Sequence, residues 1–179
     1  LHLCDKNLEQ IKPHTITATH NLLVDVCMAA KFEGVSISGR YRQYQNKYDD
    51  SPSQLCTMLA RSFADIGDIV RGKDLYLGGN SKEKRQRQKI EDNLKEIFKN
   101  IYGNLDKKDR YEGDDNYYQL REDWWALNRK DVWKALTCES GGGTYFRKTC
   151  VGENETQNNC RCRTNDVPTY FDYVPQFLR

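Results

Sequence analysis

Residues 59–74, with the sequence LARSFADIGDIVRGKD, decide the class of fold. From Leu59 onward, large apolar residues recur at spacings of four, three and four, which is the period of a helix with one buried face. Upstream, Ser51 is suited to cap a helix and Pro52 to occupy its first position. Gly72 follows the last apolar residue, where a glycine commonly ends a helix. The sequence therefore predicts a buried helix between these two signals.

The same period extends over most of the remaining chain, whereas alternating strand patterns are rare. Gly34 is expected to end the first helix, and residues 34–50 to form a surface connection. Ser81 is expected to cap the third helix, and Gly103 to end it. The predicted helices cover residues 19–32, 51–72, 81–103 and 120–136. The chain is therefore predicted to be all-α.

Aromatic residues add two expectations about packing. Trp124 and Trp125 are neighbours on one predicted helix, so they cannot both face the same interior surface. One of them is expected to lie in another interface or against the cysteine-rich loop. The strongly aromatic tail, residues 170–179, resembles the first turn of a further helix, with Pro175 near its start.

Length and charge exclude several classes of protein. The 179 residues suit one domain or two small lobes. The 28 basic and 26 acidic residues give a net charge of +2, so an anionic partner must recognise a local patch. No stretch approaches the ~18 consecutive apolar residues of a membrane span, and no signal peptide is evident. Because the chain begins at Leu1 and not at Met, we expect a fragment of a longer protein.

Seven cysteines predict a disulfide-stabilised extracellular module. Four of them lie between Cys138 and Asp166, in a segment rich in Gly, Asn and Thr that is expected to be a crosslinked loop. We expect Cys160 and Cys162 to pair with Cys138 and Cys150, in either order. A further disulfide, between Cys27 and Cys56, is expected to link the first two helices, which leaves Cys4 for a partner outside the chain.

The motifs that would support catalysis, a metal or nucleic-acid binding are missing. The spacing of the cysteines and the distant histidines do not fit a zinc site, and no nucleophile elbow, phosphate loop or metalloprotease motif occurs. The disulfide context argues against a nuclear or cytosolic partner. We therefore predict no enzyme, no catalytic residue, no metal or other cofactor, and no nucleic-acid partner.

A basic run is the strongest candidate binding site. Residues 81–89 hold five basic side chains and one acidic side chain. Arginine forks and lysine ammonium groups on one helix can grip the sulfate oxygens of an anionic glycan. The alternatives are a solvated helix face, or a neutral sugar pocket built from loop aromatics such as Tyr117 and Tyr118. The predicted glycan-binding residues are Lys82, Lys84, Arg85, Arg87 and Lys89.

Particular strings of the sequence resemble one family over the whole chain. They are LHLC at 1–4, LLVDVC at 22–27, the opening stretch at 59–74, WW at 124–125 followed by Asn128 and Arg129, VWKALTC at 132–138, and DYVPQFLR at 172–179. Together they resemble the alpha type of the Duffy-binding-like domain of the malaria parasite's erythrocyte membrane protein 1.

The resemblance implies an adhesin on the extracellular face of the infected red cell, anchored to the membrane only through the rest of its parent protein. Its partners would be erythrocyte or endothelial receptors, with rosetting or cytoadherence through sulfated glycosaminoglycans or blood-group glycans. The implied fold is a disulfide-stabilised helical one in three subdomains. Residues 1–179 would form a single domain fragment with part of the first subdomain and most of the second, without the third. Within the opening stretch, residues 61–74 would belong to the scaffold. The alternative is a structural part of a larger adhesive head, whose receptor contacts lie in missing or adjacent segments.

Overall fold

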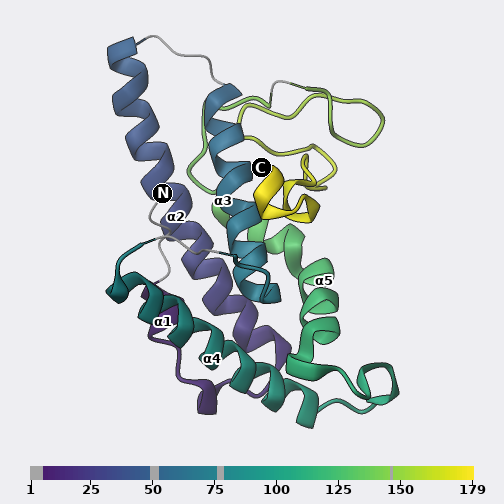
Figure 1. Cartoon of the computed structure of the whole chain (residues 1–179). Helices are drawn as coiled ribbons and strands as arrows, with labels where there is room; N and C mark the ends of the chain where they lie inside the picture. The colour runs from purple at the N-terminus through teal and green to yellow at the C-terminus, as the bar shows by residue number, and fades with distance from the viewer. Residues whose placement is uncertain (1–5, 49–52, 76–78, 146) are drawn as a thin grey trace.

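The computed structural model describes residues 6–48, 53–75, 79–145 and 147–179, and these contain helices but no strand (Figure 1). The all-α prediction is confirmed. The α-helices are α1 (Lys6–Glu9), α2 (Thr19–Tyr48), α3 (Ser53–Arg71), α4 (Ser81–Gly103) and α5 (Tyr118–Leu136). Short 3-10 turns are η1 (Pro13–Thr15), η2 (Asp109–Tyr111), η3 (Asp115–Tyr117), η4 (Phe171–Tyr173) and η5 (Gln176–Leu178).

Three long helices form the centre of the molecule, because α2, α3 and α5 all contact one another. Helix α4 runs across one end of this group, next to α1 and η1 (Figure 1). The segment after α5 passes over the side of α3, and the C-terminal turn η4 packs against the same helix. The chain end is therefore held beside residues that lie about a hundred positions earlier in the sequence.

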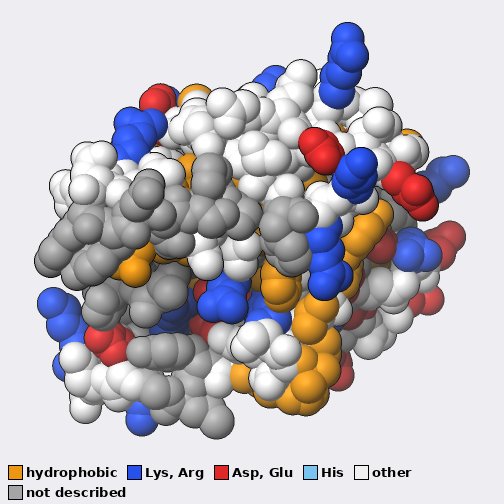
Figure 2. Space-filling view, turned by 90° about the horizontal axis from the view of Figure 1, so that it is seen from above, with side chains coloured by type: hydrophobic (Ala, Val, Ile, Leu, Met, Phe, Trp, Pro, Cys, Tyr) orange, Lys and Arg blue, Asp and Glu red, His pale blue; other side chains and the backbone are white. Residues whose placement is uncertain are grey.

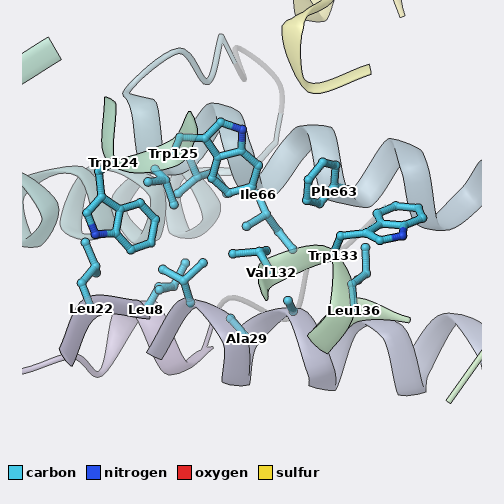
Figure 3. Packing of buried hydrophobic residues seen from close by; sticks show 14 of the residues in the cluster. Leu8, Leu22, Ala29, Phe63, Ile66, Trp124, Trp125, Val132, Trp133 and Leu136 are labelled. Carbon is cyan, nitrogen blue, oxygen red and sulfur yellow. The ribbon is translucent and has the colours of Figure 1, made fainter. Parts of the chain in front are cut away.

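The core is filled by aromatic side chains of α5 that point in different directions (Figure 3). Trp124 is 3% exposed and lies edge-on to Phe98 of α4, with 6.2 Å between ring centroids. Trp125 is fully buried and lies 5.2 Å from Phe63 of α3. Adjacent tryptophans thus occupy two interfaces, as expected for neighbours on a helix. Burying each aromatic side chain contributes roughly 3 kcal/mol to stability.

Helix α2 is longer than predicted, because Gly34 does not end it. A Cβ at this position would lie 1.9 Å from the main-chain oxygen of Leu136, so the glycine allows α2 and α5 to approach closely. The helix continues to Tyr48, and Ile37 and Tyr41 are buried on its core face. The prediction of a surface connection at 34–50 is therefore wrong for the described residues, which continue α2 to Tyr48. A glycine inside a helix and a glycine that ends one look alike in the sequence.

The ends of α3 and α4 follow local capping chemistry. Asn80, not Ser81, caps α4: its side chain accepts hydrogen bonds from the main-chain N–H groups of Lys82 and Glu83, and Glu83 completes a capping box. Ser81 is instead the first helical residue, and the predicted end of α4 at Gly103 is confirmed. Helix α3 ends before Gly72, which has a φ of +71°. The predicted start signals Ser51 and Pro52 lie outside the described residues.

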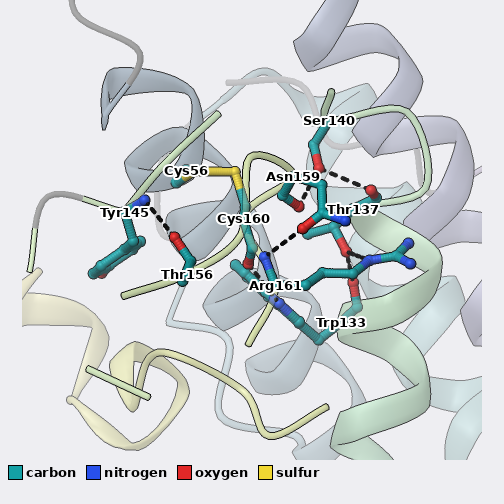
Figure 4. Close-up of a disulfide and its surroundings, with 9 residues drawn as sticks. All are labelled: Cys56, Trp133, Thr137, Ser140, Tyr145, Thr156, Asn159, Cys160 and Arg161. Carbon is teal, nitrogen blue, oxygen red and sulfur yellow. Dashed lines mark hydrogen bonds between the residues drawn. A yellow bond between two sulfur atoms is a disulfide. The ribbon is translucent and has the colours of Figure 1, made fainter. Parts of the chain in front are cut away.

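Two disulfides hold the loop after α5. Cys150 pairs with Cys162, which is one of the two arrangements expected for these residues. Cys160 pairs with Cys56 of α3, and not with Cys138 or Cys150 (Figure 4). The predicted bond between Cys27 and Cys56 is wrong, because Cys56 faces this loop from inside the core, whereas Cys27 lies on α2 near Asp131 of α5.

Cys27 and Cys138 are free thiols in the structure, and Cys4 lies outside the described residues. The loop itself is irregular, as predicted, and its two arms are joined by hydrogen bonds. The Cys160 N–H donates to Gly143, and the Ser140 hydroxyl donates to the main-chain oxygen of Asn159 at 2.7 Å. The tail forms two 3-10 turns where the start of a further helix was expected.

Candidate receptor-binding surface

The basic run forms the first two turns of α4, directly after its cap. Because the Asn80 side chain accepts hydrogen bonds from the first free N–H groups, these donors are already satisfied. An anion at this end of the helix would therefore be bound by side chains. Gln86 and Glu9 of α1 form a hydrogen bond of 3.3 Å, which fixes the start of α4 against α1.

The structure divides the five predicted glycan-binding residues into two groups. Lys82, Arg85 and Lys89 follow the spacing of one helix face and are all exposed. Arg85 is oriented by a hydrogen bond of 3.1 Å from its Nε to the main-chain oxygen of Ser81. Lys89 is 58% exposed and lies 3.9 Å from the carboxylate of Glu9. These three side chains form the outer basic face of α4, and we use this name for them below.

Lys84 and Arg87 point elsewhere, into a groove between α4 and the ends of α3 and α5. Arg87 is 24% exposed and donates a hydrogen bond of 3.0 Å to the carboxylate of Asp74. Its charge is thus already neutralised by a residue of the loop after α3. The sequence could not show this, because helix spacing alone does not reveal which basic residue meets an acid from another segment.

We call this first hollow the charged groove; it has a volume of about 390 Å³. A second hollow, the apolar groove, has a volume of about 490 Å³ and lies between the end of α3 and the C-terminal segment. Gly72 and Tyr118 line both. Of the two tyrosines suggested for a neutral sugar pocket, Tyr118 is 44% exposed, whereas the ring of Tyr117 packs at a tilt against Tyr102, with 5.7 Å between ring centroids. No pattern in the sequence marked Leu75 and Phe177, because single exposed apolar residues are common.

A buried polar cluster lies at the apolar groove, which Asp68, Arg71 and Asp172 line. Asp172 is 1% exposed, and its carboxylate accepts hydrogen bonds from Trp125 at 2.9 Å and from two nitrogens of Arg129 at 2.8 Å. Its main-chain oxygen accepts from Arg71 of α3, which also pairs with Asp68 at 3.1 Å. Trp125 and Arg129 belong to one string of the sequence and Arg71 to the stretch at 59–74, so Asp172 of the C-terminal string joins three strings into one connected unit.

The end of the chain is tied to the same cluster. Arg179 forms ion pairs with Asp65 and Asp68 of α3. Burial raises the pKa of both carboxyl groups, and the Arg179 charge opposes that rise. Ser62, Asp68 and Arg71 of the stretch at 59–74 are almost fully buried and hold other segments, whereas Arg61 and Lys73 are exposed. The expected scaffold role agrees with the burial of the first three.

The described residues contain one group of possible metal ligands. Cys150, Cys162 and Asp166 have ligand atoms within 4.8 Å of one another, but both sulfurs are joined in a disulfide. Thiolates are the form of cysteine that binds zinc, so this group does not fit a metal. In the part of the chain that the structure describes, no helix has both the length and the apolar character needed to cross a bilayer.

The model of one protein family, the Duffy binding domain, matches residues 1–179. The chain belongs to the Duffy binding domain family. Among solved structures, this Duffy binding domain chain is similar to the ICAM-1-binding DBLβ domain of the PfEMP1 protein IT4var13. The two are 36% identical with a TM-score of 0.75, and the match covers 99% of this chain and 39% of that one. No curated protein matches the chain.

These comparisons confirm the predicted family and its disulfide-stabilised helical fold. This Duffy binding domain chain spans about two-fifths of the neighbour, which is 39% covered. The neighbour is a DBLβ domain. The alpha type remains a prediction for this chain, and so does its division into subdomains.

Proposed function

We propose that this Duffy binding domain chain is the receptor-binding part of an adhesin displayed on the extracellular face of infected red cells. Its family membership carries this proposal, together with a neighbour, 36% identical, that is described as ICAM-1-binding. Two buried disulfides support an oxidising, extracellular environment. The partners would be receptors on erythrocytes or endothelial cells, and the parent protein would supply the membrane anchor.

We assign a sulfated glycan to the outer basic face of α4. Lys82, Arg85 and Lys89 are exposed on one side of a helix whose start is fixed by its cap and by α1. Lys84 and Arg87 line the charged groove instead, so the assignment rests on the three side chains of the outer basic face. Such a row of cations suits a linear polyanion, and blood-group glycans, which are less charged, suit it less well. Rosetting through heparan-sulfate-like chains would follow from this contact.

Heparin affinity chromatography tests the assignment. The variant Lys82→Glu/Arg85→Glu/Lys89→Glu should elute at a clearly lower salt concentration than the unmodified chain, because polyanion binding depends on the number of paired charges. The variant Lys99→Glu/Lys107→Glu/Lys130→Glu is the matched control, since it changes the net charge equally at exposed positions elsewhere. Equal losses in both variants would show that only net charge matters and would overturn the site.

A second candidate is a structural part of a larger head, and exposed apolar residues favour it. Figure 2 shows hydrophobic side chains gathered in a band at the surface on one face of the molecule. Phe177 and Leu178 are 75% and 67% exposed, and four exposed apolar residues, Val24, Met28, Phe32 and Val35, follow helix spacing along α2. If a larger protein that contains this chain binds red cells and the isolated chain does not bind heparin, this second function is favoured.

A further inference from the structure

We propose that the charged and apolar grooves together bind an extended peptide segment of a protein partner, with an apolar side chain in one groove and a carboxylate in the other. The inference rests on the proposed receptor-binding function, but it uses residues that lie apart from the outer basic face of α4. The occupant is identified by complementarity, since one groove is apolar and the adjoining one carries unpaired positive charge.

The two grooves adjoin at Tyr118 and Gly72. A Cβ at position 72 would lie 2.9 Å from Cε1 of Tyr118, so only the glycine lets the ring lie this close to the end of α3. The guanidinium of Arg121 lies 5.9 Å from the centre of the same ring and is itself held by two main-chain oxygens of α3. The exposed ring is therefore a fixed partition between the grooves, available to stack against a bound chain.

Hydrogen bonds join the two sides of the apolar groove, the segment after α3 and the C-terminal segment. The main-chain N–H of Leu75 donates a hydrogen bond of 2.7 Å to the side-chain oxygen of Gln176, whose amide nitrogen donates to Asp74 at 3.3 Å. Leu75 and Phe177 remain 58% and 75% exposed at its rim. A volume of about 490 Å³ exceeds what one large side chain needs, and pockets of this size commonly bind ligands.

The charged groove has a surplus of positive charge. Its two acids are already paired, because Asp74 binds Arg87 at 3.0 Å and Glu91 binds the buried Arg121 at 2.8 Å. Lys84 is exposed and forms no ion pair with the described residues, and Lys95 lies at 4.0 Å from Glu91. A carboxylate entering this groove would thus meet the ammonium group of Lys84 beside acids that are already paired.

A peptide fits this pair of grooves better than a glycan does. A sulfated sugar chain presents charge along its whole length. In the apolar groove the exposed Lys73 is already paired with Glu122, so sulfates there would lose water without gaining an unpaired cation. A peptide can combine a leucine or phenylalanine side chain with a nearby glutamate. The hydrogen-bonded sides of the apolar groove and the held ring of Tyr118 need little rearrangement on binding, which favours specific recognition of such a segment.

Synthetic peptides of four types, each made with every spacer length, provide the probe. Each carries Leu or Ala at one position and Glu or Gln at another, separated by one to four glycines, with blocked ends. Fluorescence anisotropy with the 179-residue chain should show the Leu/Glu peptide binding about tenfold or more tighter than the Leu/Gln, Ala/Glu or Ala/Gln peptide. Equal affinities for all four at every spacing would overturn the proposal.

Substitutions locate the contact. Lys84→Glu and Phe177→Ser should each abolish the preference for the Leu/Glu peptide, whereas the matched controls Lys99→Glu and Leu127→Asp, at exposed sites elsewhere, should retain it. Circular dichroism melting verifies that each variant folds. Loss of the preference in the controls as well, or its survival in both groove variants, would overturn the assignment.

The outcome is separable from the glycan test. Lys82→Glu/Arg85→Glu/Lys89→Glu should leave the preference for the Leu/Glu peptide intact while it reduces heparin binding. If the outer-face variant still binds heparin as the unmodified chain does, but the Leu/Glu preference is observed, only the glycan site is overturned. Heparin that displaces the peptide equally well from the unmodified chain and from the Lys82→Glu/Arg85→Glu/Lys89→Glu variant would instead assign the charged groove to a glycan and overturn the peptide proposal.

Discussion

Gly34 of α2 lies directly against the main-chain carbonyl of Leu136 at the end of α5, where a Cβ would approach the oxygen to 1.9 Å. The two helices pass closely at this point because the glycine has no side chain. Gly39, five residues later on the same helix, has no atom within 4 Å of the position a Cβ would take. Two glycines on one helix thus have opposite structural roles.

Alanine substitutions at these glycines should change stability in opposite directions. Gly34→Ala forces two main chains apart and should lower the free energy of unfolding by about 3 kcal/mol or more. Gly39→Ala removes only backbone freedom from the unfolded chain and should raise it by about 0.5–1 kcal/mol. Urea unfolding followed by circular dichroism measures both. A Gly34→Ala variant as stable as the unmodified chain would contradict the close approach of α2 and α5.

Asp172→Asn should destabilise the fold strongly. The carboxylate is buried and balances Arg129, whose side chain is only 11% exposed, so its loss leaves a buried cation with weaker partners. Breaking a buried pair typically costs about 3–5 kcal/mol. Asp106→Asn, at an exposed position, should change stability by less than about 0.5 kcal/mol. Thermal melting of the two variants compares them, and similar melting temperatures would refute the role of Asp172.

The two disulfides should contribute unequally. Cys56 and Cys160 are 104 residues apart, whereas Cys150 and Cys162 are 12 apart. Closing the longer loop restricts the unfolded chain more, so Cys56→Ala/Cys160→Ala should cost ~5 kcal/mol and Cys150→Ala/Cys162→Ala ~3 kcal/mol. Unfolding in guanidinium chloride measures each loss. A larger loss in the second variant would show that the disulfides do not stabilise mainly through loop closure.

The free thiols should react at different rates. Burial raises the pKa of the Cys27 thiol to about 11, and the nearby Asp131 carboxylate adds to the rise. At pH 8 its thiolate fraction should be about 100-fold below that of an unperturbed thiol, partly offset by the greater nucleophilicity of a more basic thiolate. Cys138 is exposed. Iodoacetamide should therefore modify Cys138 at least ~10-fold faster, as peptide mapping by mass spectrometry would show.

The reactivity of Cys27 should also rise with pH. The reactive thiolate is scarce well below the raised pKa and accumulates as the pH approaches about 11, so the rate should still increase above pH 9. A rate that levels off near pH 9 would show that the thiol is not perturbed by burial.

The helices and their buried faces could be predicted largely from the sequence. The spacing of apolar residues from Leu59 onward indicates which face of α3 is buried, because residues three or four positions apart lie on the same face of a helix. The same local logic placed the end of α4 at Gly103 and the irregular loop after Cys138. Asn80 was missed as the cap because the neighbouring Ser81 has an equally suitable side chain.

The sequence by itself therefore determined the helical class, the extent of most helices and the family, since these depend on local periodicity and on continuous strings. Only the tertiary structure decided that Gly34 is a contact point, that Cys56 reaches Cys160, and that Arg87 is held by Asp74 while Arg85 faces solvent. Each of these depends on the distance between segments far apart in the chain. That distance is set by how the helices pack together, and helix periodicity carries no information about it.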